Sequence, residues 1–381
     1  MPNRSPQLAH VPTDTRDLRL DFFRGLALLC IFIDHMPASH LTAYTIRNFG
    51  LSDASELFVF ISAYTAGLVH MRRVVRDGIA SAGQRIWRRA GQIYLAHLLV
   101  LVVTCGLAGW LTRAFDNPQF VQGLNVGPFL ERPVRAFIDA TVFVFQPTFM
   151  NILPLYVVLF VFLPFILWLL RRGQALALGL SFVLYLLASE FPWMDNPVGT
   201  TWQFNPSAWQ LLFVIGVSLG ASSYVEGWRI PRSRVLLVLA AAYVGWAFWT
   251  GPAAYGYDGR SVELPPAVHV LLFPVMDRAN LSVWRLAHIL ALAYLAASFL
   301  KIGNPFFRSW LARPLVLLGQ HSLTLFCVGV ILSVLGWAML TELGAGWPVQ
   351  VLVNAGGFAM MGVIAWLLSP RPARVAPQAG S

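Results

Sequence analysis

Charged side chains are scarce in this sequence. Asp, Glu, Lys and Arg make up 12% of its 381 residues, whereas a soluble globular protein carries about 25%. Hydrophobic residues account for 57%, and the mean hydropathy is +0.65. The composition therefore excludes an ordinary soluble domain and indicates an integral membrane protein.

Cysteine is also scarce, and Cys30, Cys105 and Cys327 all lie inside apolar runs. Their spacing matches neither a zinc site nor a disulfide framework, so we interpret them as small buried hydrophobic residues. The sequence also lacks a metal-ligand set, a phosphate-binding glycine loop and the Gly-x-Ser-x-Gly turn of a serine nucleophile. We therefore expect no metal, no resident cofactor and no covalent serine mechanism.

The first twenty residues are polar and include Arg4, Arg16 and Arg19. They lack the apolar core and the small-residue cleavage site of a secretory signal, so we expect the first apolar segment to remain as a membrane helix. The predicted organisation is a cytoplasmic N-terminal tail (1–20), one transmembrane domain (21–370) and a flexible C-terminal tail (371–381).

The apolar runs predict an all-α polytopic membrane protein with about ten transmembrane helices, since about 17–25 apolar residues cross a bilayer as a helix. The ninth run is long enough to tilt or break. The predicted spans are 22–36, 56–70, 91–112, 151–170, 174–190, 207–224, 234–250, 286–300, 314–340 and 349–369.

The basic residues predict the orientation of these spans. The net charge is +10, and the arginines cluster in short connections between apolar runs. With ten spans, all of these connections fall on the side of the N-terminus, which the positive-inside rule makes the cytoplasm. We therefore expect both termini inside, a lipid bilayer as partner and no nucleic acid. The densest cluster, in the 71–89 connection, is Arg72, Arg73, Arg76, Arg85, Arg88 and Arg89 against Asp77.

The stretch RGLALLCIFIDHMP places Arg24 and His35 eleven positions apart. At 100° per residue both lie on one face of a helix, about 16 Å apart along its axis. An ionisable group at membrane depth costs about 2.5–3.5 kcal/mol and usually faces a cavity. Two plainer interpretations stay open: Arg24 extends to the membrane surface, and Asp34 with His35 ends the helix before Pro37.

Three acidic or basic groups are candidates for chemistry in such a cavity. His35 has an ordinary pKa near 6.5, so it can take a proton from a hydroxyl group as a general base. Asp34 can orient the ring, although adjacent helical residues point about 100° apart. Glu56 either lies beside His35 or forms a capping box with Asp53, three residues earlier.

Several segments together resemble the OpgC family of membrane succinyltransferases, within the acyltransferase-3-like superfamily. Arg24 and His35 match the superfamily's arginine–ten residues–histidine motif, and Ser62-Ala63-Tyr64 is similar to its Ser-Gly-Phe/Tyr element, departing at Ala63. RIWRRAGQIY resembles its basic motif, without the usual proline near Ile93. The other segments are RDLRLDFFRGLALLCIFIDHMP, SDASELFVFISAYTAG, NILPLYVVLF, FNPSAWQLLFVIG and LGQHSLTLF.

The resemblance implies transfer of a succinyl group from cytoplasmic succinyl-CoA to hydroxyl groups of osmoregulated periplasmic glucans, across a bacterial inner membrane. The expected catalytic residues are His35, Asp34 and Glu56. The expected donor-binding residues are Arg24, Ser62, Arg85, Arg88 and Arg89. The expected acceptor-binding residues are Asp53, Trp209 and Gln210.

Other interpretations of these residues remain open. The 71–89 arginines can act only as topology signals, and Trp209 can be an interfacial anchor rather than a stacking platform for a sugar. The acyl group or the glycan can differ. A proton-coupled transporter using Asp34, His35 and Glu56 is a further alternative, although the sequence lacks the paired, broken spans of such transporters. The sequence also leaves open the oligomeric state and the choice between direct transfer and an acyl-enzyme relay.

Overall fold

The structure is a computed structural model that describes residues 16–188, 202–227, 229–251 and 277–369. Over these residues the regular structure is entirely helical. Short 3-10 turns cover His40–Tyr44, Ile46–Asn48 and Pro305–Arg308. The α-helices are α1 (Leu18–Asp34), α2 (Ala54–Phe115), α3 (Gln119–Gly123), α4 (Gly127–Glu131), α5 (Pro133–Thr141), α6 (Ile152–Arg172), α7 (Gln174–Leu186), α8 (Pro206–Ala221), α9 (Arg234–Thr250), α11 (Val283–Phe299), α12 (Arg313–Gln320), α13 (Ser322–Glu342) and α14 (Trp347–Leu368).

Each of the ten predicted apolar runs coincides with helix in the structure. Two of them, 56–70 and 91–112, belong to α2, which bends at Gly78, where φ is +82° and ψ is 164°. Glycine adopts this left-handed φ without steric cost, so the chain can change direction there. The ninth run breaks at His321, between α12 and α13.

Four helices are long and apolar enough to cross a membrane: α2, α6, α13 and α14. Four shorter apolar helices accompany them, α7, α8, α9 and α11. The all-helical membrane class is thus confirmed, while the number of crossings and the side of each terminus stay predictions. The C-terminal tail and most of the N-terminal tail lie outside the described residues.

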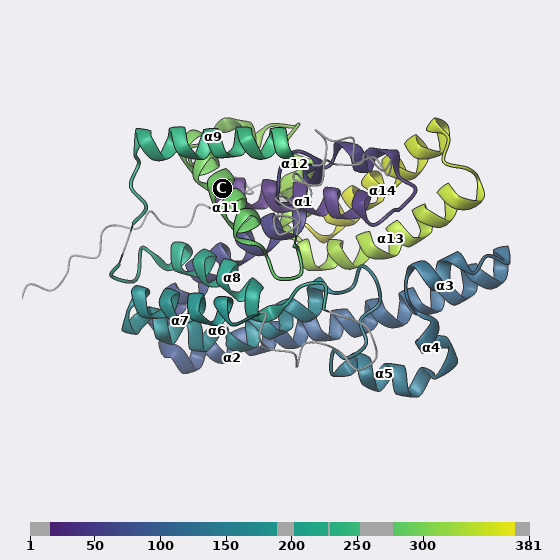
Figure 1. Ribbon diagram of the computed structural model, residues 1–381, viewed down its shortest axis with the longest axis horizontal. Helices are drawn as coiled ribbons and strands as arrows, with labels where there is room; N and C mark the ends of the chain where they lie inside the picture. Colours follow the sequence, from purple (N-terminus) through teal and green to yellow (C-terminus); the bar gives the residue numbers. More distant parts are fainter. Residues whose placement is uncertain (1–15, 189–201, 228, 252–276, 370–381) are drawn as a thin grey trace, which may run out of the picture.

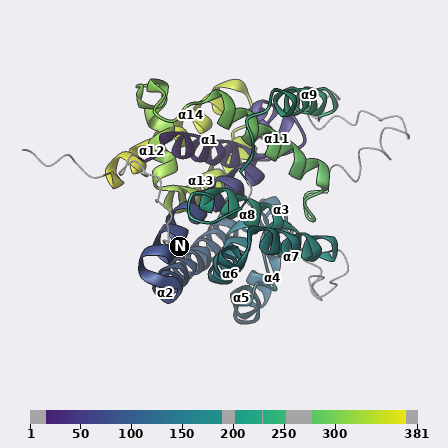
Figure 2. The same ribbon diagram turned by 90° about the vertical axis from the view of Figure 1, so that its left-hand side faces the viewer.

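Helix α1 lies in the middle of the molecule (Figures 1 and 2). It packs against α12 and α13 on one side and against α2 on the other. Helices α6, α7 and α8 form a layer with α2, and α9 pairs with α11 away from that layer. Any group on α1 is therefore enclosed by helices from both ends of the sequence.

Close contact between α1 and α12 depends on two glycines. A Cβ atom on Gly25 would overlap the backbone carbonyl of Leu315, and one on Gly319 would overlap the carbonyl of Asp21. Small residues let helix backbones approach in this way where lipid offers no hydrophobic driving force. The same approach brings the carbonyl of Gly319 to the guanidinium of Arg24.

Substitution Gly319→Ala should lower the melting temperature of the protein in detergent, because the added methyl group must push α12 away from α1. Overpacking of this kind costs about 1–3 kcal/mol. Gly356→Ala on α14 is the matched control, since a Cβ there meets nothing within 4 Å. Equal melting temperatures for the two variants would contradict the close α1–α12 contact.

Candidate functional site

A cavity of about 410 Å³ opens between α1, α2, α6 and α13, and we call it the basic pocket. Residues on both sides of Gly78 line it, so the two halves of α2 approach each other there. All five predicted donor-binding residues are among the lining: Arg24, Ser62, Arg85, Arg88 and Arg89. The remainder of the lining includes two further basic side chains, His70 and Arg73.

Arg24 is buried, with 8% of its surface exposed. Its Nη2 donates to Oγ1 of Thr65 at 2.8 Å, and its Nη1 donates to the carbonyl of Gly319 at 3.4 Å. Asp21 lies 3.5 Å away, but Arg16 already occupies both oxygens of that carboxylate. The charge of Arg24 is therefore only partly balanced, and it faces a cavity instead of extending to a surface.

Three other arginines of the basic pocket are exposed and available. Arg85, Arg88 and Arg89 form no ion pair in the part of the chain that the structure describes, and Arg89 donates only to Gln92, at 3.0 Å. Ser62 is half-buried and lines the same pocket as Tyr156, whose hydroxyl group donates to the carbonyl of Phe58 at 3.0 Å. Guanidinium groups with free donors bind phosphate oxygens in a bidentate manner, so this pocket can hold a polyphosphate ligand.

His35 lies at the opposite end of α1, where it caps the helix. Its ring stacks on Phe149, with 4.5 Å between ring centroids. Its Nδ1 is buried and has no hydrogen-bond partner among the described residues. The pairing of Arg24 with Thr65 makes α1 and the first half of α2 antiparallel, so His35 is level with the start of α2.

His35 is not among the residues that line the basic pocket. Phe58 lines the pocket, and its ring lies 5.7 Å from that of Tyr156 and 6.3 Å from that of Phe326, which line it too. Phe58 comes seven residues, or about 10 Å, before Thr65 on α2. These aromatic rings therefore line the pocket at a level between Arg24 and His35.

Asp34 forms a hydrogen bond with Thr45, whereas the sequence suggested that it orients the ring of His35. Its Oδ1 accepts a hydrogen bond from Oγ1 of Thr45 at 2.8 Å. Because α1 stays helical through Asp34, the side chains of Asp34 and His35 leave the helix in different directions. Asp34 thus fixes the turn that follows α1.

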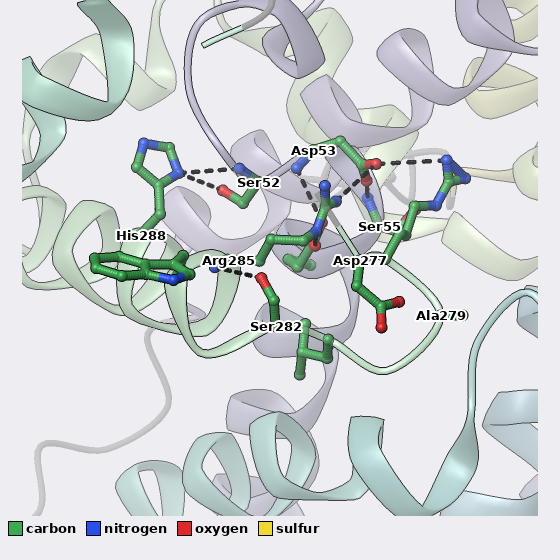
Figure 3. Close-up of polar contacts among 12 residues, drawn as sticks. Ser52, Asp53, Ser55, Asp277, Ala279, Ser282, Arg285 and His288 are labelled. Carbon is green, nitrogen blue, oxygen red and sulfur yellow. Dashed lines mark hydrogen bonds and ion pairs between the residues drawn. The ribbon is translucent and has the colours of Figure 1, made fainter. Parts of the chain in front are cut away.

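Glu56 and Asp53 form the predicted capping box. Oδ1 of Asp53 accepts from the amide of Ser55 at 2.7 Å, and Oε2 of Glu56 accepts from the amide of Asp53 at 2.9 Å. The structure adds Arg285 of α11, whose Nε donates to Glu56 at 2.6 Å and whose Nη2 donates to Asp53 at 3.1 Å (Figure 3). Glu56 is completely buried, so this arginine is what balances its charge.

Asp53 joins this buried pair to a second, more exposed arginine. Nη1 of Arg278 lies 3.6 Å from Oδ2 of Asp53. Burial by itself raises the pKa of Asp53, but Arg278, Arg285 and the amide of Ser55 together hold the pKa well below its usual range. Asp53 is therefore ionised, and it lies at the start of α2, level with His35.

The two remaining predicted acceptor residues, Trp209 and the half-buried Gln210, both have hydrogen-bond partners within the protein. Trp209 is fully buried, and its Nε1 donates to the carbonyls of Arg278 at 3.0 Å and Ala279 at 3.2 Å. Nε2 of Gln210 donates to the carbonyl of Ser181 at 2.8 Å, and its Oε1 accepts from the Ser181 hydroxyl at 2.6 Å. In this geometry Trp209 holds the loop before α11, and its indole offers no open face to a sugar.

Three residues of this region escaped the sequence interpretation. Arg285 and Arg278 come from the chain around the start of α11, and His288 follows one turn later. Nδ1 of His288 accepts from the hydroxyl and the amide of Ser52, at 2.7 and 3.2 Å (Figure 3). Arg285 and His288 stand at the start of an apolar run, where ionisable side chains are costly at membrane depth. That cost could have marked them in the sequence as residues with a buried partner.

The described residues include no group of three or more His, Cys, Asp or Glu side chains that could hold a metal ion. The three cysteines are free.

Comparison with protein families gives one match, to the family described as OpgC protein, over residues 16–372. Comparisons with curated proteins and with solved structures gave no match. The matched range contains every helix described above, including both ends of α1 and the whole basic pocket.

Substitution Arg285→Leu should destabilise the protein by about 3–5 kcal/mol, because it leaves the buried Glu56 without a counter-charge. Denaturation in detergent measures this loss. The matched control is Arg278→Gln, which removes a half-exposed partner of the same Asp53 and should cost about 0–1 kcal/mol. Similar losses in the two variants would mean that burial of Glu56 does not set the energetics.

Proposed function

The chain belongs to the OpgC family of membrane transferases, and from this premise we propose that it moves a succinyl group from cytoplasmic succinyl-CoA to hydroxyl groups of osmoregulated periplasmic glucans. The observation that carries the proposal is the basic pocket, which gathers Arg24, Ser62, Arg85, Arg88 and Arg89 from separate turns of α1 and α2. The proposed location is the bacterial inner membrane, with several crossings.

The donor binds through its phosphate groups. Arg85, Arg88 and Arg89 are exposed at the mouth of the basic pocket and have free N–H donors, as phosphate binding requires. Arg24 supplies a partly balanced positive charge deeper in the pocket. From there the extended arm of succinyl-CoA has to cover about 16 Å along α1 to bring its thioester to His35.

His35 acts as the general base in this proposal. It takes the proton of a glucan hydroxyl, and the resulting alkoxide attacks the thioester carbonyl carbon. The carbon–sulfur bond breaks, the CoA thiolate leaves and takes up the proton held by the imidazole, and the glucan keeps the succinyl ester. The support is that Nδ1 of His35 has no hydrogen-bond partner in the described part of the chain.

In this proposal, the cluster of Asp53, Glu56 and Arg285 positions the groups around His35. Arg285 ties α11 to the start of α2 through Glu56 and Asp53. We infer that Glu56 acts on His35 through this framework, as a positioning residue. Asp34 holds the following turn through Thr45 in the same way.

Substitution His35→Ala should lower transfer of labelled succinyl groups to periplasmic glucan by about 10²–10⁴-fold, the usual contribution of a general base. Purified protein in detergent, incubated with labelled succinyl-CoA and the glucan, measures the transfer. His40→Ala is the matched control, because His40 is an exposed histidine just after the same helix.

Other outcomes of this assay separate the alternatives. Undiminished transfer by His35→Ala would remove the histidine from the mechanism. Label transferred only from a different acyl donor would change the substrate. Uptake into proteoliposomes without any acylated glucan would favour a transporter.

Replacing Arg88 and Arg89 together by alanine should raise the KM for succinyl-CoA by roughly tenfold or more, since each lost charge-assisted hydrogen bond is worth about 1.5–3 kcal/mol. The value of kcat should change less. The control is the double variant Arg171→Ala with Arg172→Ala, which removes the same charge at the end of α6, outside the basic pocket. A raised KM in both would point to general electrostatic attraction instead of a donor site.

A further inference from the structure

The succinyl group differs from most acyl groups in carrying a free carboxylate, and only two methylene groups separate it from the thioester carbonyl. When that carbonyl lies beside His35, the carboxylate must lie close to the same ring. Arg24 stands about 16 Å away along α1 and cannot reach it at that moment. A cation near His35 is therefore needed if the carboxylate is to be bound during transfer.

Arg278 is the cation that meets this requirement. Its Nη1 lies 3.6 Å from Oδ2 of Asp53, the residue just before α2, and His35 is level with that end of α2. Its side chain is 44% exposed, and among the described residues this long contact with Asp53 is its only ion pair. A guanidinium has five N–H donors, so most of its bonding capacity is available for an incoming carboxylate.

The neighbouring arginines are less suitable. Arg285 is only 8% exposed in its side chain, and both Glu56 and Asp53 occupy it. Arg47 is exposed in the turn at Ile46–Asn48, and in the described part of the chain it forms no ion pair with Asp53. Arg47 is for this reason a useful control.

The loop that carries Arg278 is held in place before any ligand arrives. The guanidinium lies over the ring of Phe204, with its central carbon 5.3 Å from the ring centroid. The indole of Trp209 donates to the carbonyl of Arg278, and the amide of Asn205 donates to that of Ala279 at 2.9 Å. Fixing a binding group in advance lowers the entropy cost of binding.

We propose that Arg278 binds the free carboxylate of the succinyl group beside His35 and thereby selects a dicarboxylic acyl donor over an uncharged one. This inference rests on the proposed succinyl transfer and adds the residue that recognises the acyl group. It also gives Trp209 a role, which is to fix the loop that presents Arg278.

The test compares succinyl-CoA with butyryl-CoA, whose acyl chain has a methyl group where succinyl has its carboxylate. The two donors compete for one glucan, and mass spectrometry of the product measures the ratio of their kcat/KM values. Arg278→Gln should lower this ratio roughly 10- to 100-fold, the range expected for a lost charged hydrogen bond. Arg278→Lys should keep part of the ratio, and Arg47→Gln should leave it unchanged.

Several results would overturn the inference. An unchanged ratio in Arg278→Gln, with succinyl transfer intact in the natural protein, would show that the carboxylate is bound elsewhere, and the proposed function would stand. An equal loss on both donors would give Arg278 a purely structural role. If Arg278→Gln does not fold, the ratio in Arg278→Lys decides. Absence of succinyl transfer by the natural protein would remove the proposed function together with this inference.

Discussion

Burying a charged side chain in an apolar protein costs several kcal/mol unless a partner or a water-filled cavity compensates for it. This cost explains where the charged groups of the chain lie. Glu56 is completely buried and has Arg285 at 2.6 Å, whereas Arg24 has only partial compensation and faces the basic pocket. The first arrangement stabilises the helices around α2. The second leaves a positive charge ready for an anionic ligand.

The two ends of α1 are built from different kinds of contact. At the Arg24 end, the arginines of the basic pocket come from one continuous stretch of α2, with Arg24 added from α1. At the His35 end, the groups come from the starts of α2 and α11 and from the loop before α11. A transfer reaction between two compartments needs such a division, because the donor and the acceptor approach from opposite sides.

Local patterns made much of this architecture predictable. Hydropathy located the apolar helices, and the Asp-x-x-Glu spacing indicated the capping box. The length of the ninth run indicated that it tilts or breaks, and the structure shows a break at His321. The donor-binding residues gather in one pocket because they lie within a few turns of a helix hairpin. Arg285 was missed because 229 positions separate it from Glu56, and a pair at that distance leaves no local pattern. Trp209 was predicted to bind the acceptor or to anchor the helix at the membrane interface, since only its tertiary contacts show that it is fully buried.

The backbone conformation of Gly78 affects the width of the basic pocket. The residues of α2 on either side of it form facing walls of that pocket, so one pair of torsion angles sets how far apart the walls stand. A side chain at this position would meet no neighbouring atom, but L-residues rarely adopt a φ of +82°. A replacement would thus act through the main chain alone: without any steric clash, it would change the angle between the two halves of α2 and with it the size of the ligand that fits the basic pocket.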